Sequence, residues 1–213
     1  GLNDVSTGMH GSWADYDNDG DLDLYVVNTE NFPNRLFRND ISSEGVFTET
    51  GEMADMQLGI GGSWGDFDED GDLDYYLTGG NSDNTTINRL YYNTSENNGN
   101  NWIQVVLAGT ESNASAIGAR VKINTATRKL TRFVESSMGR GSQNSLAVEF
   151  GLGPEDIVES LEVSWPSGNV QILTDIPVNQ VLHIEEVHTS TPEPVLLSAA
   201  DVPHDQGGYV TLK

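Results

Sequence analysis

Asp15-Tyr16-Asp17-Asn18-Asp19-Gly20-Asp21-Leu22-Asp23 is an acidic nonapeptide that returns, with few changes, as Asp66-Phe67-Asp68-Glu69-Asp70-Gly71-Asp72-Leu73-Asp74. Aspartate fills positions 1, 3, 5, 7 and 9 of both copies, and glycine fills position 6. Ca²⁺ prefers about six to eight oxygen ligands, and carboxylates at alternate residues around a glycine turn surround one ion. We therefore predict two calcium loops, in which position 7 contributes its backbone carbonyl and keeps its side chain at the rim.

An empty loop of this kind is unfavourable, because carboxylates about 4–5 Å apart repel by about 1 kcal/mol per pair in water. A solvated acidic turn is the alternative, but two copies with the same placement of acids and glycine favour calcium. An EF-hand is excluded, because its loop needs a glutamate at position 12 and a helix on each side. Position 12 is Val26 or Leu77 here, and the flanking residues have strand character.

The similarity between the two copies extends beyond the loops. Gly8–Asp15 matches Gly59–Asp66 at an offset of 51 residues, and Asn34–Asn39 matches Asn88–Asn93 at an offset of 54. Each unit is expected to run strand, calcium loop, strand, connector, strand, which is the size of one β-propeller blade.

Residues 8–93, with the acidic nonapeptides set in a Gly-Ser-Trp frame, resemble two FG-GAP/VCBS repeats. These are the calcium-loop blades of integrin α-subunit propellers and of bacterial surface and secreted proteins. Such propellers close with more than two blades, so either the chain is part of a longer protein or something else covers the exposed blade edges. The resemblance implies that the carbonyls of Asp21 and Asp72 complete two shells whose side-chain ligands are Asp15, Asp17, Asp19, Asp23, Asp66, Asp68, Asp70 and Asp74.

A polar stretch at Asn93–Asn101 separates the repeats from a second pattern of short strands and turns. Seven strands at this spacing predict a compact antiparallel β-sandwich or barrel. Ile117–Val121, Phe150–Gly153 and Val163–Gly168 resemble the ASPIC/UnbV domain, which follows FG-GAP/VCBS repeats in other proteins. The expected strands are Trp102–Ala108, Gly118–Asn124, Lys129–Glu135, Ser145–Phe150, Ser160–Trp165, Val170–Leu173 and Val181–Glu185.

The chain is thus predicted to be all-β, with β-propeller-type blades followed by the compact sandwich or barrel. Residues 1–100 hold the two repeats, and residues 101–187 form the ASPIC/UnbV-like domain. Residues 188–213 hold a Pro-rich linker at Thr189–Pro194 and a stretch that resembles the start of a fibronectin-III-like module.

The composition narrows the class of partner. Asp and Glu number 33 against 10 Lys and Arg, so the formal net charge is −23, and two Ca²⁺ ions leave about −19. Nucleic acid and anionic membrane surfaces need a cationic footprint and are poor partners. No cysteine is available for disulfides, and no apolar run is long enough to insert into a membrane. The first residues do not form a signal peptide, so an exported protein is expected to carry its targeting segment upstream.

Other candidate chemistry is weaker, and we expect no enzyme activity. Ser63 lies in a Gly-x-Ser-x-Gly pattern, but no helix pattern follows it and it is the repeat equivalent of Ser12. Trp13 and Trp64 also occupy equivalent positions and are expected in the core. The histidines form no zinc motif: they are His10, His183, His188 and His204.

Six of the ten basic residues fall within 21 positions of the second domain. One interpretation is a solvated face of the sheet. The other is a docking surface for the acidic calcium-loop blades or for an anionic glycan, which also favours self-association. The six residues are Arg120, Lys122, Arg128, Lys129, Arg132 and Arg140.

The function expected from the sequence is an extracellular or cell-surface scaffold or adhesion segment. Ca²⁺ would rigidify β-blades that present a binding or assembly surface to a protein or an anionic glycan. A lectin-like module that binds polysaccharide is one alternative. The accessory region of a secreted polysaccharide-degrading enzyme is another.

Overall fold

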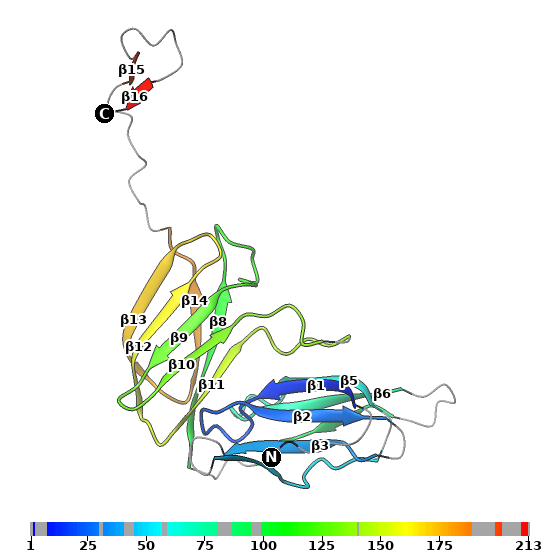
Figure 1. Ribbon diagram of the computed structural model, residues 1–213. Helices are drawn as coiled ribbons and strands as arrows, with labels where there is room; N and C mark the ends of the chain where they lie inside the picture. Colours follow the sequence, from blue (N-terminus) through cyan, green and yellow to red (C-terminus); the bar gives the residue numbers. More distant parts are fainter. Residues whose placement is uncertain are drawn as a thin grey trace.

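The computed structural model describes residues 2, 8–29, 32–40, 45–56, 59–80, 87–94, 99–139, 141–188, 199–201 and 210–212. These residues form strands, turns and loops with no helix among them, which confirms the all-β fold class (Figure 1). It follows that none of the described residues forms a helix of the length and apolar character needed to cross a membrane.

The first blade is a four-stranded antiparallel sheet with its strands in chain order. The predicted calcium loop joins its first two strands. The short fourth strand was not expected, because four residues are too few to show alternation. The strands are β1 (Gly8–Ala14), β2 (Asp23–Asn28), β3 (Arg35–Asp40) and β4 (Val46–Glu49).

The second blade repeats this plan with three strands, β5 (Gly59–Gly65), β6 (Asp74–Gly79) and β7 (Arg89–Tyr91). Ala14 pairs with Asp23 in the first blade, and Gly65 pairs with Asp74 in the second. Each acidic nonapeptide is therefore closed at its base by a strand pair, which holds its first and last residues close together.

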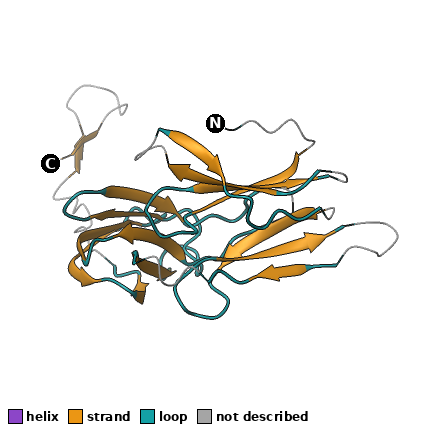
Figure 2. Ribbon diagram, turned by 90° about the horizontal axis from the view of Figure 1, so that it is seen from below, coloured by secondary structure: helices purple, strands orange, loops and turns teal. Residues whose placement is uncertain are grey.

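The two blades pack against each other through an aromatic core, with β1 next to β5 (Figure 1). Figure 2 shows the strands and the loops that join them from a second direction. The Tyr25 and Tyr75 rings lie 4.6 Å apart, and the Trp64 and Tyr75 rings 4.7 Å apart. Trp64 Nε1 also donates a hydrogen bond of 3.1 Å to Ser12 Oγ. Burial of three aromatic rings between the sheets is a large stabilising contribution.

The second domain contains all seven expected strands in two sheets, ordered β10-β9-β12-β13 and β11-β8-β14. The sheets do not close into a barrel and share one core, which leaves the sandwich of the two predicted alternatives. One detail differs from the expectation: β14 runs parallel to β8. The chain crosses from one sheet to the other between β13 and β14, so β14 returns beside β8 in the same direction. The strands are β8 (Asn101–Ala108), β9 (Arg120–Asn124), β10 (Lys129–Phe133), β11 (Val148–Gly153), β12 (Ile157–Ser164), β13 (Val170–Pro177) and β14 (Gln180–Glu185).

Alternation along these strands separates a core face from an outer face. Ile103 and Val105 of β8 are fully buried in the core with Phe150 of β11 and Val121 of β9. The opposite face of β8 and β11 is therefore free to contact the blades. Beyond this domain, β15 (Ala199–Asp201) and β16 (Val210–Leu212) pair antiparallel, whereas the predicted linker at 189–194 lies outside the described residues.

Candidate metal centres

The first loop gathers carboxylates between β1 and β2. Three aspartates each place one carboxylate oxygen within 4.8 Å of the others: Asp15, Asp17 and Asp19. Asp23 closes the loop from the start of β2 and is buried. Its two oxygens accept hydrogen bonds from Tyr16 N at 3.1 Å and Asn39 N at 2.7 Å. The loop is thus tied to the third strand of its own blade.

The second loop lies between β5 and β6 and gathers positions 1, 3 and 9 of its nonapeptide, where the first loop gathers positions 1, 3 and 5. Its three clustered carboxylates belong to Asp66, Asp68 and Asp74. Asp74 is the repeat equivalent of Asp23, and it accepts hydrogen bonds from Phe67 N at 2.9 Å and Asn93 N at 2.7 Å. Asn39 and Asn93 end the matching Asn-Arg-Leu segments, so the sequence similarity there reflects a shared role in holding the loops.

Backbone conformation explains the glycine at position 6. Gly20 and Gly71 have φ angles of 97° and 96°, a region that L-residues rarely adopt. In this conformation Gly20 N donates to both carboxylate oxygens of Asp15, at 3.2 and 3.1 Å, and Gly71 N donates to Asp66 Oδ2 at 3.0 Å. The turn therefore fixes the first carboxylate of each loop.

The raised pKa values of the buried aspartates in the first loop indicate that a bound cation would stabilise it. Burial raises the pKa of Asp15 to about 7, of Asp17 to about 6 and of Asp23 to about 9, and neighbouring aspartates add to each shift. Without a bound cation Asp23 keeps its proton at neutral pH and Asp15 is only partly ionised, whereas Asp17 is mostly ionised. The gathered donors are carboxylate oxygens, which fit Ca²⁺ better than the softer transition metals.

Position 7 departs from the prediction in the second loop. Asp72 is only 5% exposed, so its side chain does not lie at the rim. Its Oδ1 accepts a hydrogen bond of 2.7 Å from Asn18 Nδ2, because the first loop packs against it. The two loops are therefore in direct contact. The assignment of all ten aspartates as calcium ligands stays a prediction, and four of them lie outside the two close carboxylate groups: Asp21, Asp23, Asp70 and Asp72.

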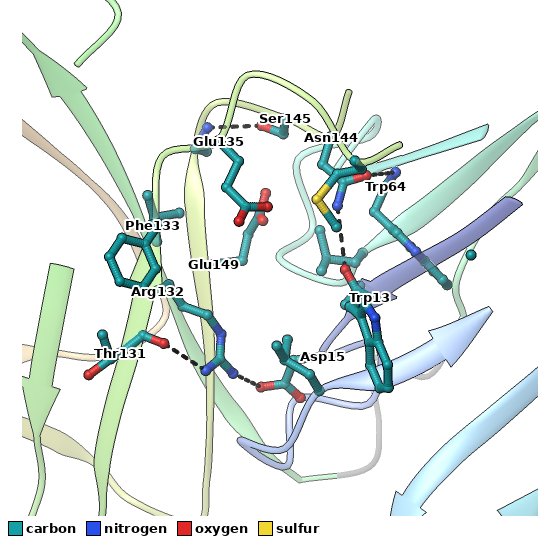
Figure 3. Close-up of a pocket in the computed structure, with 17 residues that line it drawn as sticks. Trp13, Asp15, Trp64, Thr131, Arg132, Phe133, Glu135, Asn144, Ser145 and Glu149 are labelled. Atoms are coloured by element: carbon teal, nitrogen blue, oxygen red, sulfur yellow. Dashed lines mark hydrogen bonds and ion pairs between the residues drawn. The ribbon is translucent and has the colours of Figure 1, made fainter. Parts of the chain in front are cut away.

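The basic cluster of the second domain divides into two parts. Arg128 Nη1 donates to the carbonyl of Asp19, and Arg132 Nη2 donates to the carbonyl of Gly20 at 3.2 Å. Arg132 also pairs with Asp15 at 3.8 Å, as Figure 3 shows. These two arginines support the docking interpretation. Arg120 and Lys122 instead face Glu162 across the sheet at 3.8 and 3.6 Å, and Arg140 lies outside the described residues.

The two equivalent tryptophans have different environments. Trp64 is 3% exposed, as expected, but Trp13 is 40% exposed, so the prediction of a core position is wrong for Trp13. Trp13 lines a cavity of about 610 Å³ between the blades and the second domain, which also contains Phe133 and Asn144 (Figure 3). Ser63 lies within β5 and is followed by the calcium loop and β6, not by a helix.

Comparison with known proteins identifies both parts of the chain. Residues 15–77 match the FG-GAP-like repeat, and residues 109–191 match the ASPIC and UnbV domain. The chain thus carries an FG-GAP-like repeat region followed by an ASPIC/UnbV domain, as its motifs indicated.

The chain is also homologous to cartilage acidic protein 1. It is 30% identical to the Homo sapiens protein over 203 residues, which is 91% of this chain and 30% of that protein. It is 31% identical to the Xenopus tropicalis protein over 186 residues, 82% of this chain and 28% of that protein. The chain therefore spans less than a third of the length of these relatives.

Proposed function

We propose that this chain is an extracellular calcium-binding scaffold or adhesion segment and not an enzyme. The observation that carries the proposal is the pair of aspartate clusters at equivalent places in two blades. Homology to cartilage acidic protein 1 and the strongly acidic composition support it. The partner would be a protein or an anionic glycan, whereas nucleic acid and membrane insertion are disfavoured by the net charge of −23.

The residues of each loop prepare a site for one ion. In both loops the glycine amide fixes position 1, two backbone amides fix position 9, and position 3 brings a further carboxylate. In the first loop the carboxylate of position 5 also joins the close group. A bound Ca²⁺ would supply the positive charge that offsets their mutual repulsion. The blade then keeps one shape at the surface that it presents to a partner.

A thermal melt with calcium and with excess EDTA tests this function. We expect a large rise in melting temperature with calcium, and a stoichiometry of two ions per chain by isothermal titration. The double variant Asp17→Asn/Asp68→Asn is the control and should lose both the heat of binding and the calcium-dependent stabilisation. A wild-type chain that binds no calcium would contradict the proposal.

A second candidate function is recognition of a saccharide in the cavity. Trp13 and Phe133 are 40% and 55% exposed there, and Asn144 and Glu135 also line it. Exposed aromatic rings beside polar groups suit the stacking and hydrogen bonding of a sugar ring. Binding to an array of soluble polysaccharides should be lost in Trp13→Ala and kept in Tyr92→Ala, an exposed aromatic outside this cavity.

A further inference from the structure

One face of the second domain contacts both acidic loops of the blades. In the sheet β11-β8-β14, Gln104 pairs with Glu149 and Trp102 pairs with Gly151. Residues two apart along a strand share a face, so these four positions form one patch on neighbouring strands. The core residues Ile103 and Phe150 alternate with them and point the other way.

This patch donates a hydrogen bond to the first carboxylate of each loop. Gly151 N donates to Asp15 Oδ2 at 2.9 Å, and Gln104 Nε2 donates to Asp66 Oδ2 at 2.7 Å. Asp15 and Asp66 are equivalent residues, and each also accepts the amide of its own loop glycine. Donors from two domains thus converge on the same carboxylate oxygens.

The contact is close enough to involve the backbone of the loops. A Cβ atom added to Gly71 would lie 1.9 Å from the Trp102 ring, and one added to Gly151 would lie 2.4 Å from Asn18 backbone atoms. Gly153 N also donates to Asn18 O at 2.9 Å. The loops thus lie against this face in the same conformation that gathers their carboxylates.

We propose that the ASPIC/UnbV domain completes the calcium sites, with Gln104 as a positioning residue for Asp66 and the amide of Gly151 as the equivalent donor to Asp15. Calcium binding to the blades and docking of the second domain are then linked. This inference rests on the proposed calcium function and adds a partner within the chain to each site.

The physical reason lies in how a carboxylate ligand is oriented. A donor that holds one oxygen of Asp66 limits its rotamers and directs the free lone pairs to the ion, and such supporting partners set metal affinity. Without an ion, repulsion spreads the carboxylates, and the acceptors leave the donors of the second domain. Because linkage is reciprocal, docking of the second domain strengthens calcium binding by the same factor by which calcium binding strengthens docking.

Calcium titration of the full chain tests the role of Gln104. Gln104→Met removes the amide donor and keeps the side-chain length, and Gln143→Met, at an exposed position, is the matched control. An Asp17→Asn background reports the second loop alone, and an Asp68→Asn background reports the first. We expect Gln104→Met to weaken binding at the second loop by about 10- to 100-fold and to have a much smaller effect on the first loop, which it reaches only through docking.

Hydrogen exchange of the wild-type chain tests the linkage without any variant. The amides of Gly151 and Gly153 should exchange more slowly with calcium than with EDTA. The amides of β9, in the other sheet of the second domain, should keep their exchange rates. Equal affinity of Gln104→Met and wild type at the second loop, or calcium-independent protection of Gly151, would overturn the inference alone. A wild-type chain without any calcium binding would overturn the proposed function and this inference together.

Discussion

The two blades carry the same Gly-Ser-Trp sequence before the same loop, yet they bury opposite faces. In the first blade Ser12 is fully buried and Trp13 is 40% exposed, whereas in the second Trp64 is 3% exposed and Ser63 is half-buried. Neighbouring residues on a strand point to opposite faces, so the Ser12 face of one blade receives the Trp64 face of the other. Either face of the repeated strand can therefore be buried, and the position of the adjacent blade decides which one is.

The second strands of the blades also bury opposite faces. Tyr25 and Val27 of β2 are buried, but the buried pair in β6 is Tyr75 and Leu77, one position earlier in the repeat. Apolar residues occur on both faces of each strand, which suits a unit built to have a neighbour on either side. Three predictions test this comparison between the blades, beginning with the largest expected effect, and a fourth takes a carboxylate of the second domain as a reference.

Alanine at the two tryptophans should have very different effects. Trp64→Ala removes a ring packed between Tyr25 and Tyr75 and should lower the free energy of unfolding by about 3–5 kcal/mol. Trp13→Ala should cost less than about 1 kcal/mol, because the side chain is partly in solvent. Urea unfolding at constant calcium measures both, and equal losses would show that the blades are not packed in this way.

Removal of one ion at a time should show that the loops are equivalent as metal sites. Asp17→Asn and Asp68→Asn should each lower the free energy of unfolding by about 2.7 kcal/mol when free calcium is 100 times Kd. In EDTA both variants should be at least as stable as wild type, since a repelling charge has gone. A loss that persists in EDTA would mean that the carboxylates serve packing and not calcium. Contact between Asn18 and Asp72 further predicts that the two losses do not add.

Substitution of the two equivalent serines should give a smaller difference in stability. Ser12 Oγ accepts the indole N–H of Trp64, so Ser12→Ala leaves a buried donor without its partner and should cost about 1 kcal/mol. Ser63 lies on the opposite face of its blade, and Ser63→Ala should stay within about 0.5 kcal/mol of wild type. Urea denaturation midpoints distinguish the two variants, provided that the unfolding free energy of both depends equally steeply on urea concentration.

A buried carboxylate in the second domain provides a reference that needs no cation. Burial by itself raises the pKa of Glu186, but hydrogen bonds from Ser167 and the amides of Ser112, Glu111 and Thr110 outweigh it and lower the pKa to about 2. Because the folded pKa lies below the ordinary value of 4.5, this stabilisation is full above pH 4.5 and is lost as pH falls towards 2. Glu186→Gln should therefore be less stable than wild type at pH 7, and the difference should shrink below pH 4.5. A difference independent of pH would contradict this explanation.

Much of the molecule is predictable from the sequence because its signals are local. The strand, loop, strand order of each blade follows from alternation around the acidic nonapeptides, and six of the seven strands of the second domain lie within a few residues of their expected bounds. Expected bounds at Ser145–Phe150 are displaced from β11, since the residues before Val148 bond to Trp64 instead of pairing in a sheet. The parallel pairing of β14 with β8 has no local signature.

The sequence by itself determined the two acidic loops and their turns, because the spacing of the aspartates and the left-handed glycine are properties of nine consecutive residues. Only the tertiary structure decided which tryptophan is buried, since both have the same neighbours in the chain. It also placed Gln104 and Gly151 on the carboxylates of Asp66 and Asp15, 38 and 136 residues away. A single side chain or amide that donates across such a separation leaves no pattern in the sequence, because its role depends on where the sheet places it.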